Sequence, residues 1–356
     1  MMKKTISLLL ALIFVMSLTA CGGGNAPAND ANPPAENTQP NDAQQPGEPE
    51  DTAEPDTRPE ASYYPVTITT YDYEGNEIET TYEKAPEKVL CVYQGTIETM
   101  IALGLEDHVT ASYGLDNPVK AEWEAGFAKM NYNEDVFAPD KETVLMMEPD
   151  MIFSWGSLFS EKNLGNQPEW ITNGANTYIS TNTRRGGSRV LENEYADLIN
   201  IGKIFNVEDK AQAIVDEMKN EIAGVLEQTK GQDAPRVAII EFLGEDISNY
   251  GASSLGGDMV TQLGGELVEP EASSIGKEDL LGLDPDVIFV VYMARTEGVE
   301  EEMRSKVVDD PAFAELSAVK NGRVCTIMLG DMYASTVRSI DGIRTFAAGM
   351  YPELYQ

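Results

Sequence analysis

The sequence predicts an α/β protein of two similar lobes with mostly parallel sheets, joined by one long rigid helix, with a ligand cleft between the lobes. Two observations predict this fold class. The hexapeptide EPDMIF at residues 148–153 returns as DPDVIF at residues 284–289. Each copy places an acidic residue and a proline, which end a preceding helix, before an apolar run typical of a strand buried on both faces. Strand-like and helix-like segments alternate around both copies, as they do in parallel βα units.

The length and the charge of the chain limit the number of domains it can form and the kinds of partner it can bind. Its 356 residues suffice for two domains with their own cores. The 60 Asp and Glu residues outnumber the 25 Lys and Arg residues, which gives a formal net charge of −35. This excess of negative charge repels phosphate backbones and anionic lipid headgroups, so we expect no nucleic-acid partner. We expect the protein to be a monomer.

The N-terminal region is predicted to carry targeting signals rather than folded structure. Residues 1–20 are interpreted as a lipoprotein signal peptide, because Lys3 and Lys4 precede an apolar stretch too short for a membrane span. LTAC, ending at Cys21, resembles a bacterial lipobox, whose cysteine is acylated; an ordinary secretion signal with an incidental cysteine is the alternative. Residues 21–62 hardly contain an apolar side chain and are predicted to form a disordered, acidic, Pro-rich tether. The expected location is the outer face of the bacterial cell membrane, with acyl chains on Cys21 as the anchor.

The first α/β lobe is predicted over residues 63–190. Residues 66–83 alternate in polarity around a central Glu-Gly-Asn turn, as expected of a surface hairpin. The following elements are predicted in order: strand KVLCVY, helix TIETMIALGLED, strand VTASYG, the first EPDMIF strand, and a strand within NTYISTNTRR.

The connecting helix is predicted over residues 191–230, and the second α/β lobe over residues 231–356. The helical pattern is strongest at residues 208–229, where apolar side chains recur at three- and four-residue steps. The second lobe then repeats the order of the first, with strand RVAIIEF, the Gly-rich turn NYGASSLGGD, helix MVTQLGG, the DPDVIF strand and strand VCTIML. Ser253 or Ser254 is expected to cap the helix after the Gly-rich turn.

Large aromatic and arginine side chains follow successive strands, where loops diverge and ligands bind in open parallel sheets. Rigid aromatic rings with polar tips and guanidinium groups suit a bulky, oxygen-rich, partly apolar ligand. Aromatic residues in loops can also simply cover the edges of a core, and this alternative remains open for each position. The candidate ligand-binding residues are Tyr93, Gln94, Tyr113, Trp155, Arg184, Arg185, Tyr250, Tyr292, Arg295 and Tyr333.

The sequence offers no pattern for catalysis or for a resident metal or cofactor. His108 is the only histidine, and the chain contains no zinc-type His/Cys cluster, no Gly-x-Ser-x-Gly elbow and no Walker loop. Cys91 and Cys325 lie in apolar runs and are expected to be buried strand residues rather than a disulfide. We therefore expect a binding protein and no enzyme. The alternatives are a surface hydrolase that uses paired carboxylates and a scaffold or adhesin lipoprotein.

Several stretches together resemble the substrate-binding lipoproteins of iron-siderophore, haem and cobalamin importers, which form the helix-linked (class III) group of ABC-transporter binding proteins. The resemblance covers nearly everything from residue 66 to the C-terminus. It is carried by YDYEGNEIETTYEKAPEKVL, TIETMIALGLED, LMMEPDMIFSW, LINIGKIFNVEDKAQAIVDEM, TQLGGELV, LDPDVIFVV and DDPAFAELSAVKNGRVCTI. It implies capture of an iron-siderophore or similar iron chelate between the lobes and delivery to an ABC-transporter permease. Haem and cobalamin are the alternative ligands.

The resemblance also implies two docking carboxylates, one at the rim of each lobe, that bind arginine pockets of the permease. The matching residue in the first lobe is Glu98. In the second lobe Thr261 stands where some relatives have an acidic residue, so Asp258 is the candidate there. Closure around the ligand is expected to be a small rocking motion, because one stiff helix joins the lobes.

Overall fold

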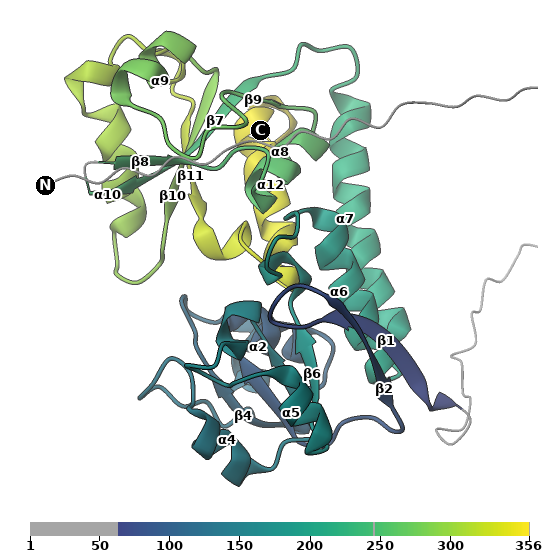
Figure 1. Cartoon of the computed structure of the whole chain (residues 1–356). Helices are drawn as coiled ribbons and strands as arrows, with labels where there is room; N and C mark the ends of the chain where they lie inside the picture. Colours follow the sequence, from purple (N-terminus) through teal and green to yellow (C-terminus); the bar gives the residue numbers. More distant parts are fainter. Residues whose placement is uncertain (1–62, 245, 356) are drawn as a thin grey trace, which may run out of the picture. The chain divides into compact units, whose positions relative to one another are not determined.

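The computed structural model describes residues 63–244 and 246–355 (Figure 1). The predicted signal peptide, the predicted acylation site Cys21 and the predicted tether lie outside these described residues. Among the helices within the described ranges, none combines the length and the apolar character needed to cross a membrane.

A β-hairpin opens the described chain, as predicted. Strand β1 (Val66–Tyr71) pairs antiparallel with β2 (Glu77–Tyr82). The turn is fixed by Asp72, whose carboxylate accepts a hydrogen bond from the backbone N–H of Asn76 at 2.9 Å. Gly75 adopts a φ of 89°, a conformation that glycine reaches without steric cost.

The first lobe is built on a four-stranded, all-parallel sheet with the strand order β4-β3-β5-β6. Its strands are β3 (Val89–Val92), β4 (Val109–Tyr113), β5 (Met151–Ser154) and β6 (Asn176–Ile179). Its helices are α2 (Gln94–Ala102), α3 (Glu124–Phe127), α4 (Lys141–Met147) and α5 (Gln167–Thr172). Every residue of β3 and β5 is buried, which confirms the prediction of strands covered on both faces.

The second lobe contains a mostly parallel sheet with the order β11-β10-β7-β8, and β9 pairs with β7. Its strands are β7 (Arg236–Leu243), β8 (Asp246–Asn249), β9 (Glu266–Leu267), β10 (Val287–Tyr292) and β11 (Val324–Met328). Its helices are α8 (Leu255–Gln262), α9 (Lys277–Leu283), α10 (Val299–Val308), α11 (Ser317–Lys320) and α12 (Ser339–Met350). The short antiparallel strand β8 was not predicted, because it lies in a segment without an apolar run.

The repeated hexapeptide has the same backbone in both lobes. Glu148 ends α4 and Asp284 ends α9, both in the left-handed conformation, with φ values of 48° and 41°. The strands β5 and β10 follow directly. The α/β class with two similar lobes and mostly parallel sheets is thus confirmed.

The predicted connecting segment 191–230 is two helices rather than one. Helix α6 (Leu191–Ile204) ends at a left-handed residue, Asn206, with a φ of 54°, and α7 (Glu208–Gln228) begins two residues later. The N–H of Val207 closes the end of α6 by donating to the carbonyl of Gly202 at 2.8 Å. The two helices pack closely at Gly202. A Cβ atom added to Gly202 would lie only 2.7 Å from the Cβ atom of Ala211 on α7. The chain therefore reverses before the long helix starts.

Helix α7 contacts both lobes (Figure 1). Near its start, Lys210 Nζ donates to the carbonyl of Leu103 in the first lobe at 3.0 Å. Further along, Glu217 accepts from Arg344 on α12 of the second lobe at 2.8 Å. One apolar cluster includes buried residues of both lobes together with the inner face of α7, which consists of Ala211, Val215, Met218, Ile222 and Val225. Helix α7 therefore packs against both lobes and links them.

The two cysteines of the described chain are both free thiols. Cys91 is buried in β3, and Cys325 is partly buried in β11. Both cysteines belong to strands, as expected, but the expected burial holds for Cys91 and only in part for Cys325.

Candidate ligand-binding cleft

Three predicted aromatic residues meet where the lobes face each other. Tyr93 follows β3 and Trp155 follows β5, so both stand at the carboxyl end of the first sheet. Their ring centroids are 3.5 Å apart. Tyr333, which follows β11 in the second lobe, lies 5.7 Å from Trp155. Phe137, which the sequence analysis did not single out, extends the row at 6.3 Å from Tyr93.

The backbone of Tyr93 is strained. Its φ and ψ of 95° and 151° lie in a region that glycine occupies and other residues avoid. The N–H of Tyr93 donates to the carbonyl of Tyr113 on the neighbouring strand at 2.8 Å, and this bond holds the conformation. Burial raises the pKa of the Tyr93 phenol, as does the nearby carboxylate of Asp116. In this conformation the ring of Tyr93 packs against Trp155.

An arginine-rich pocket lies beside these rings. It has a volume of about 500 Å³ and is lined by Tyr73, Gly156, Ser157, residues 183–187 and Arg189 of the first lobe and by Ser253 of the second lobe. Arg184 stacks on Tyr71 at 4.1 Å from the ring centroid, and Arg189 stacks on Tyr333 at 4.8 Å. Arg185 instead pairs with Glu74 of the hairpin turn at 2.7 Å. Within the described ranges neither Arg184 nor Arg189 has a carboxylate partner.

Tyr250 belongs to the same region from the side of the second lobe. Its hydroxyl donates to Glu241 at 2.7 Å. Burial raises its pKa most, and Glu241 raises it further, whereas the nearby Arg189 guanidinium acts in the opposite direction. The hydrogen bond to Glu241 fixes the orientation of the Tyr250 ring within the second lobe.

Four predicted residues have other surroundings. The side-chain oxygen of Gln94 accepts from the backbone N–H groups of Asp116 and Asn117 at 3.1 and 2.8 Å, so it positions a loop. Tyr113 is buried in the apolar core beneath the first sheet. Arg295 is largely exposed and pairs with Asp116 at 3.4 Å. Tyr292 ends β10, where burial and the carboxylates of Glu300 and Asp331 raise its pKa to about 12.

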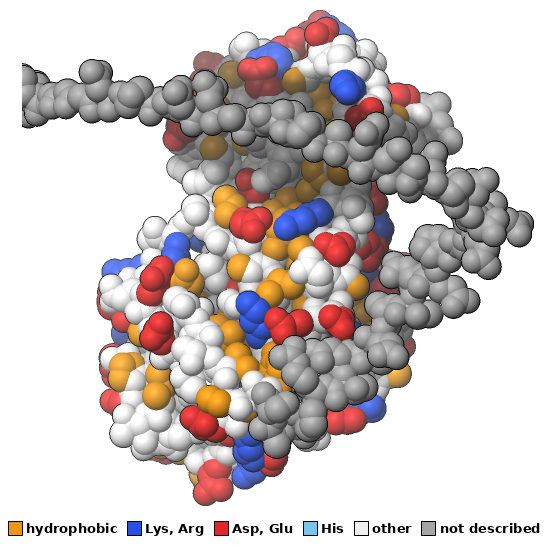
Figure 2. Space-filling model, turned by 90° about the vertical axis from the view of Figure 1, so that its right-hand side faces the viewer, with side chains coloured by type: hydrophobic (Ala, Val, Ile, Leu, Met, Phe, Trp, Pro, Cys, Tyr) orange, Lys and Arg blue, Asp and Glu red, His pale blue; other side chains and the backbone are white. Residues whose placement is uncertain are grey.

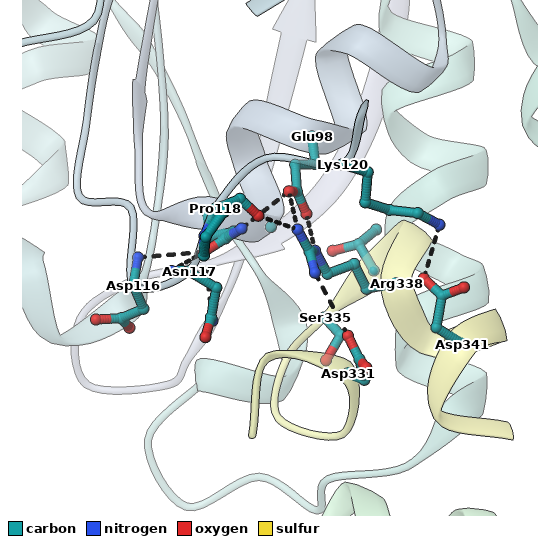
Figure 3. Close-up of polar contacts among 12 residues, drawn as sticks. Glu98, Asp116, Asn117, Pro118, Lys120, Asp331, Ser335, Arg338 and Asp341 are labelled. Carbon is teal, nitrogen blue, oxygen red and sulfur yellow. Dashed lines mark hydrogen bonds and ion pairs between the residues drawn. The ribbon is translucent and has the colours of Figure 1, made fainter. Parts of the chain in front are cut away.

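The two expected docking carboxylates do not lie free on an exposed rim. Glu98 is fully buried and is paired with Arg338 of the second lobe, as Figure 3 shows. Burial raises the pKa of Glu98, while the Arg338 guanidinium opposes that shift. Asp258 is partly buried and accepts a hydrogen bond from the N–H of Leu191 at 2.7 Å, which caps the start of α6. Each carboxylate joins two elements of the fold.

Two further residues of the cleft, Arg189 and Phe137, escaped sequence analysis. Arg189 follows the TRR stretch by only four residues, so its place in the same loop was the available signal. Phe137 lies in a long loop without periodic pattern, half exposed, and nothing in the sequence marks it. On the face drawn in Figure 2, basic and acidic side chains are interspersed, and no large basic area covers that face.

The fold and the cleft define a class of protein: a two-lobed binding protein whose lobes face each other across aromatic and arginine side chains. The sequence profile of the periplasmic binding protein family matches residues 89–328. A periplasmic binding protein of known structure from Veillonella parvula is 31% identical, with a TM-score of 0.78, over 82% of this chain and 93% of that one.

Two Bacillus subtilis proteins are also similar. The ABC transporter substrate-binding lipoprotein YvrC is 23% identical over 300 residues, which cover 82% of this chain and 88% of YvrC. The petrobactin-binding protein YclQ is 25% identical over 264 residues, which cover 72% of this chain and 79% of YclQ. The chain belongs to the periplasmic binding protein family, as its sequence motifs indicated. It is a substrate-binding protein and not an enzyme.

Proposed function

We propose that this protein is a lipid-anchored, extracytoplasmic receptor that captures an anionic ferric chelate of the siderophore type and delivers it to the permease of an ABC transporter. The observation that carries the proposal is the pair of guanidinium groups on Arg184 and Arg189. They stand beside aromatic rings in a pocket of about 500 Å³, without carboxylate partners among the described residues. In a chain of net charge −35, such a site favours a negatively charged ligand that the rest of the surface repels.

The chemistry of the cleft matches the parts of an iron chelate. Guanidinium groups donate paired hydrogen bonds to catecholate or carboxylate oxygens. The faces of Tyr93, Trp155 and Tyr333 suit the flat or apolar parts of the same molecule. Trp155 adds a donor, because its buried Nε1 has no hydrogen-bond acceptor within the described protein. The name of the relative YclQ, a petrobactin-binding protein, supports this ligand class.

Haem and cobalamin fit the cleft less well. A tyrosine binds haem iron as a phenolate, and burial raises the pKa of Tyr93 and of Tyr250, which favours their neutral forms. Cobalamin is nearly neutral and leaves the charges of Arg184 and Arg189 unmatched. An anionic ferric chelate can contact the aromatic rings of the cleft and also pair with the guanidinium groups of Arg184 and Arg189.

A fluorescence titration tests the proposal. Tryptophan emission of the purified protein is followed while a ferric tris-catecholate, a ferric hydroxamate, haemin or cyanocobalamin is added. We expect saturable quenching by an anionic ferric chelate. Arg184→Gln and Arg189→Gln should each weaken that binding by about 10- to 100-fold, because each removes a charge-assisted hydrogen bond.

The control variant is Arg304→Gln. Arg304 lies on α10, away from the cleft, and pairs with Glu301 on its own helix. We expect this variant to bind like the wild-type protein. Saturable binding of cyanocobalamin alone, or equal affinities in all three arginine variants, would contradict the proposal.

A further inference from the structure

One segment of the second lobe is buried against the first lobe. Residues 334–339, here called the latch segment, connect the cleft residue Tyr333 to helix α12, and each of the six is at most 4% exposed. The segment contacts α2 of the first lobe and α6 of the connecting segment. At Gly95 on α2 an added Cβ would lie 2.9 Å from the carbonyl oxygen of Ala334, so only glycine fits there. The surface of α2 at Gly95 therefore fits closely against the latch segment.

Two carboxylates, one on α2 of the first lobe and one on α6 of the connecting segment, hold the latch segment. Glu98 on α2 forms a two-point ion pair with Arg338, with distances of 2.6 Å to Nε and 2.7 Å to Nη2 (Figure 3). Arg338 Nη2 also donates to the carbonyl of Pro118 at 2.7 Å. Glu194 on α6 accepts a hydrogen bond from the backbone N–H of Thr336. The side chains of Glu98 and Arg338 are 0% and 5% exposed, so their attraction is little screened by water or salt.

The backbone of the latch segment is strained. Ala334 and Thr336 have φ values of 49° and 46°, in the left-handed region that residues with a Cβ avoid, and a β-branched residue avoids it most. Such conformations persist only where the surrounding contacts impose them. Part of these contacts comes from the first lobe, and part comes from the second lobe itself, where Asp331 lies 3.6 Å from Arg338. Separation of the lobes would remove the first part.

The ring of Tyr333 links this segment to the cleft. Tyr333 immediately precedes the latch segment, and its ring packs at a tilt of 49° against Trp155 of the first lobe. The cavity that remains beneath Tyr93 and Tyr333 has a volume of about 10 Å³ and is also lined by Glu98 and Arg338. A nanometre-sized ligand can lie between these rings only when the lobes separate.

We propose that the latch segment is a gate: its ion pair from Arg338 to Glu98 holds the lobes closed, and it must withdraw from the first lobe before ligand can enter or leave the cleft. The proposal rests on the proposed function, because it describes how the same cleft opens. The other ion pairs between the lobes, from Lys120 to Asp341 and from Asp116 to Arg295, are partly solvated and hold the lobes less firmly.

Hydrogen exchange of the ligand-free protein tests the gate directly. We expect Arg338→Met to raise the exchange rate in residues 333–339 and 93–99 by at least about ten-fold, while strands β3 and β7 keep their protection. Arg344→Gln is the matched control, since Arg344 also pairs with two carboxylates but lies on the exposed side of α12 and outside the lobe contact. This control should leave exchange in both segments unchanged.

A second variant guards against misfolding, because Arg338→Met alone leaves the buried carboxyl groups of Glu98 and Asp331 without their cation. The double variant Glu98→Gln with Arg338→Met removes both charges of the ion pair between the lobes, and it leaves Asp331, whose pKa burial raises to about 7. We expect it to fold and still to show the fast local exchange. Exchange at the wild-type rate in the double variant, or a uniform rise over the whole chain, would overturn the gate.

Stopped-flow mixing with the ferric tris-catecholate separates the gate from the proposed ligand. We expect the double variant to bind the chelate faster than the wild-type protein. If exchange rises in the variant but the binding rate does not, the latch segment does not control entry and the proposal is wrong. If neither protein binds any ferric chelate, the proposed function fails, while the exchange result still decides whether this segment opens locally.

Discussion

At the scale of single residues, one aspartate in each lobe anchors the start of a neighbouring strand. The carboxylate of Asp150 accepts hydrogen bonds at 2.8 Å from the N–H groups of Glu87 and Lys88, just before β3. The carboxylate of Asp286 accepts one at 2.8 Å from the N–H of Arg236, the first residue of β7. The backbone N–H of each aspartate donates back to the same neighbouring segment. The repeated hexapeptide thus combines a helix end, a strand and a clamp on the adjacent strand.

We expect Asp150→Ala and Asp286→Ala each to lower the free energy of unfolding by about 1–2 kcal/mol, because each leaves strand N–H groups without their charged acceptor. The two losses should add in the double variant, since the residues lie in different lobes. Urea unfolding followed by circular dichroism measures both. Asp233→Ala, at an exposed position between α7 and β7, is the control and should change little. Losses no larger than that of the control would show that the clamp is dispensable.

At the scale of elements, the break between α6 and α7 is set by one residue. Asn206 is left-handed, with a φ of 54°, and lets the chain turn so that α6 packs against α7. Asparagine reaches this conformation more easily than other residues with a Cβ, and glycine reaches it most easily. The stability of the helix pair therefore depends on the residue at this position.

We expect Asn206→Ala to lower the free energy of unfolding by about 1 kcal/mol, because alanine is strained in the left-handed region. Asn206→Gly should be close to neutral. The midpoints of thermal unfolding of the three proteins test this order. Equal midpoints for the alanine and glycine variants would mean that the backbone of this turn does not limit stability.

The elements also show what sequence could and could not predict. Buried strands such as β3 and β10, and the inner face of α7, follow from apolar patterns that the structure reproduces. The loops after the strands pointed to Tyr93, Trp155 and Arg184, and the structure places all three at the carboxyl edge of the first sheet, because parallel strands end at one edge of a sheet. The burial of Glu98 could not be predicted, because its partner Arg338 is 240 positions away in the sequence. Pairing across that separation depends on tertiary contact alone.

At the scale of the whole molecule, buried carboxyl groups at the lobe contact make stability depend on pH. Burial raises the pKa of Asp331 to about 7, partly opposed by Arg338 and reinforced by Asp341 and Glu98. Burial likewise raises the pKa of Glu194 to about 7, with Asp197 adding to the shift and the donors Asn182 and Thr336 opposing it. In the unfolded chain both groups titrate near their ordinary values, about 4.

The native state therefore binds more protons than the unfolded state between about pH 4 and pH 7. The stabilisation from these protons is complete below the unfolded pKa values and is lost as pH rises through about 7. We expect the free energy of unfolding to fall by a few kcal/mol, on the order of 2–4, between about pH 5.5 and pH 8. Urea unfolding at the two pH values measures it.

Asp331→Asn supplies the comparison for the pH effect. It removes one titrating group while preserving the size of the side chain, so the difference in unfolding free energy between the two pH values should shrink. A wild-type protein that becomes more stable as pH rises over this interval would contradict the assignment of raised pKa values to these carboxyls.

The two free thiols bear on the iron chemistry of the proposed cargo. Burial raises the pKa of Cys91, and burial also raises that of Cys325. A thiol that stays protonated is a poor metal ligand and is slow to be oxidised. For the ferric chelate proposed above as cargo, we therefore expect neither sulfur to compete with the chelator for the iron or to reduce it.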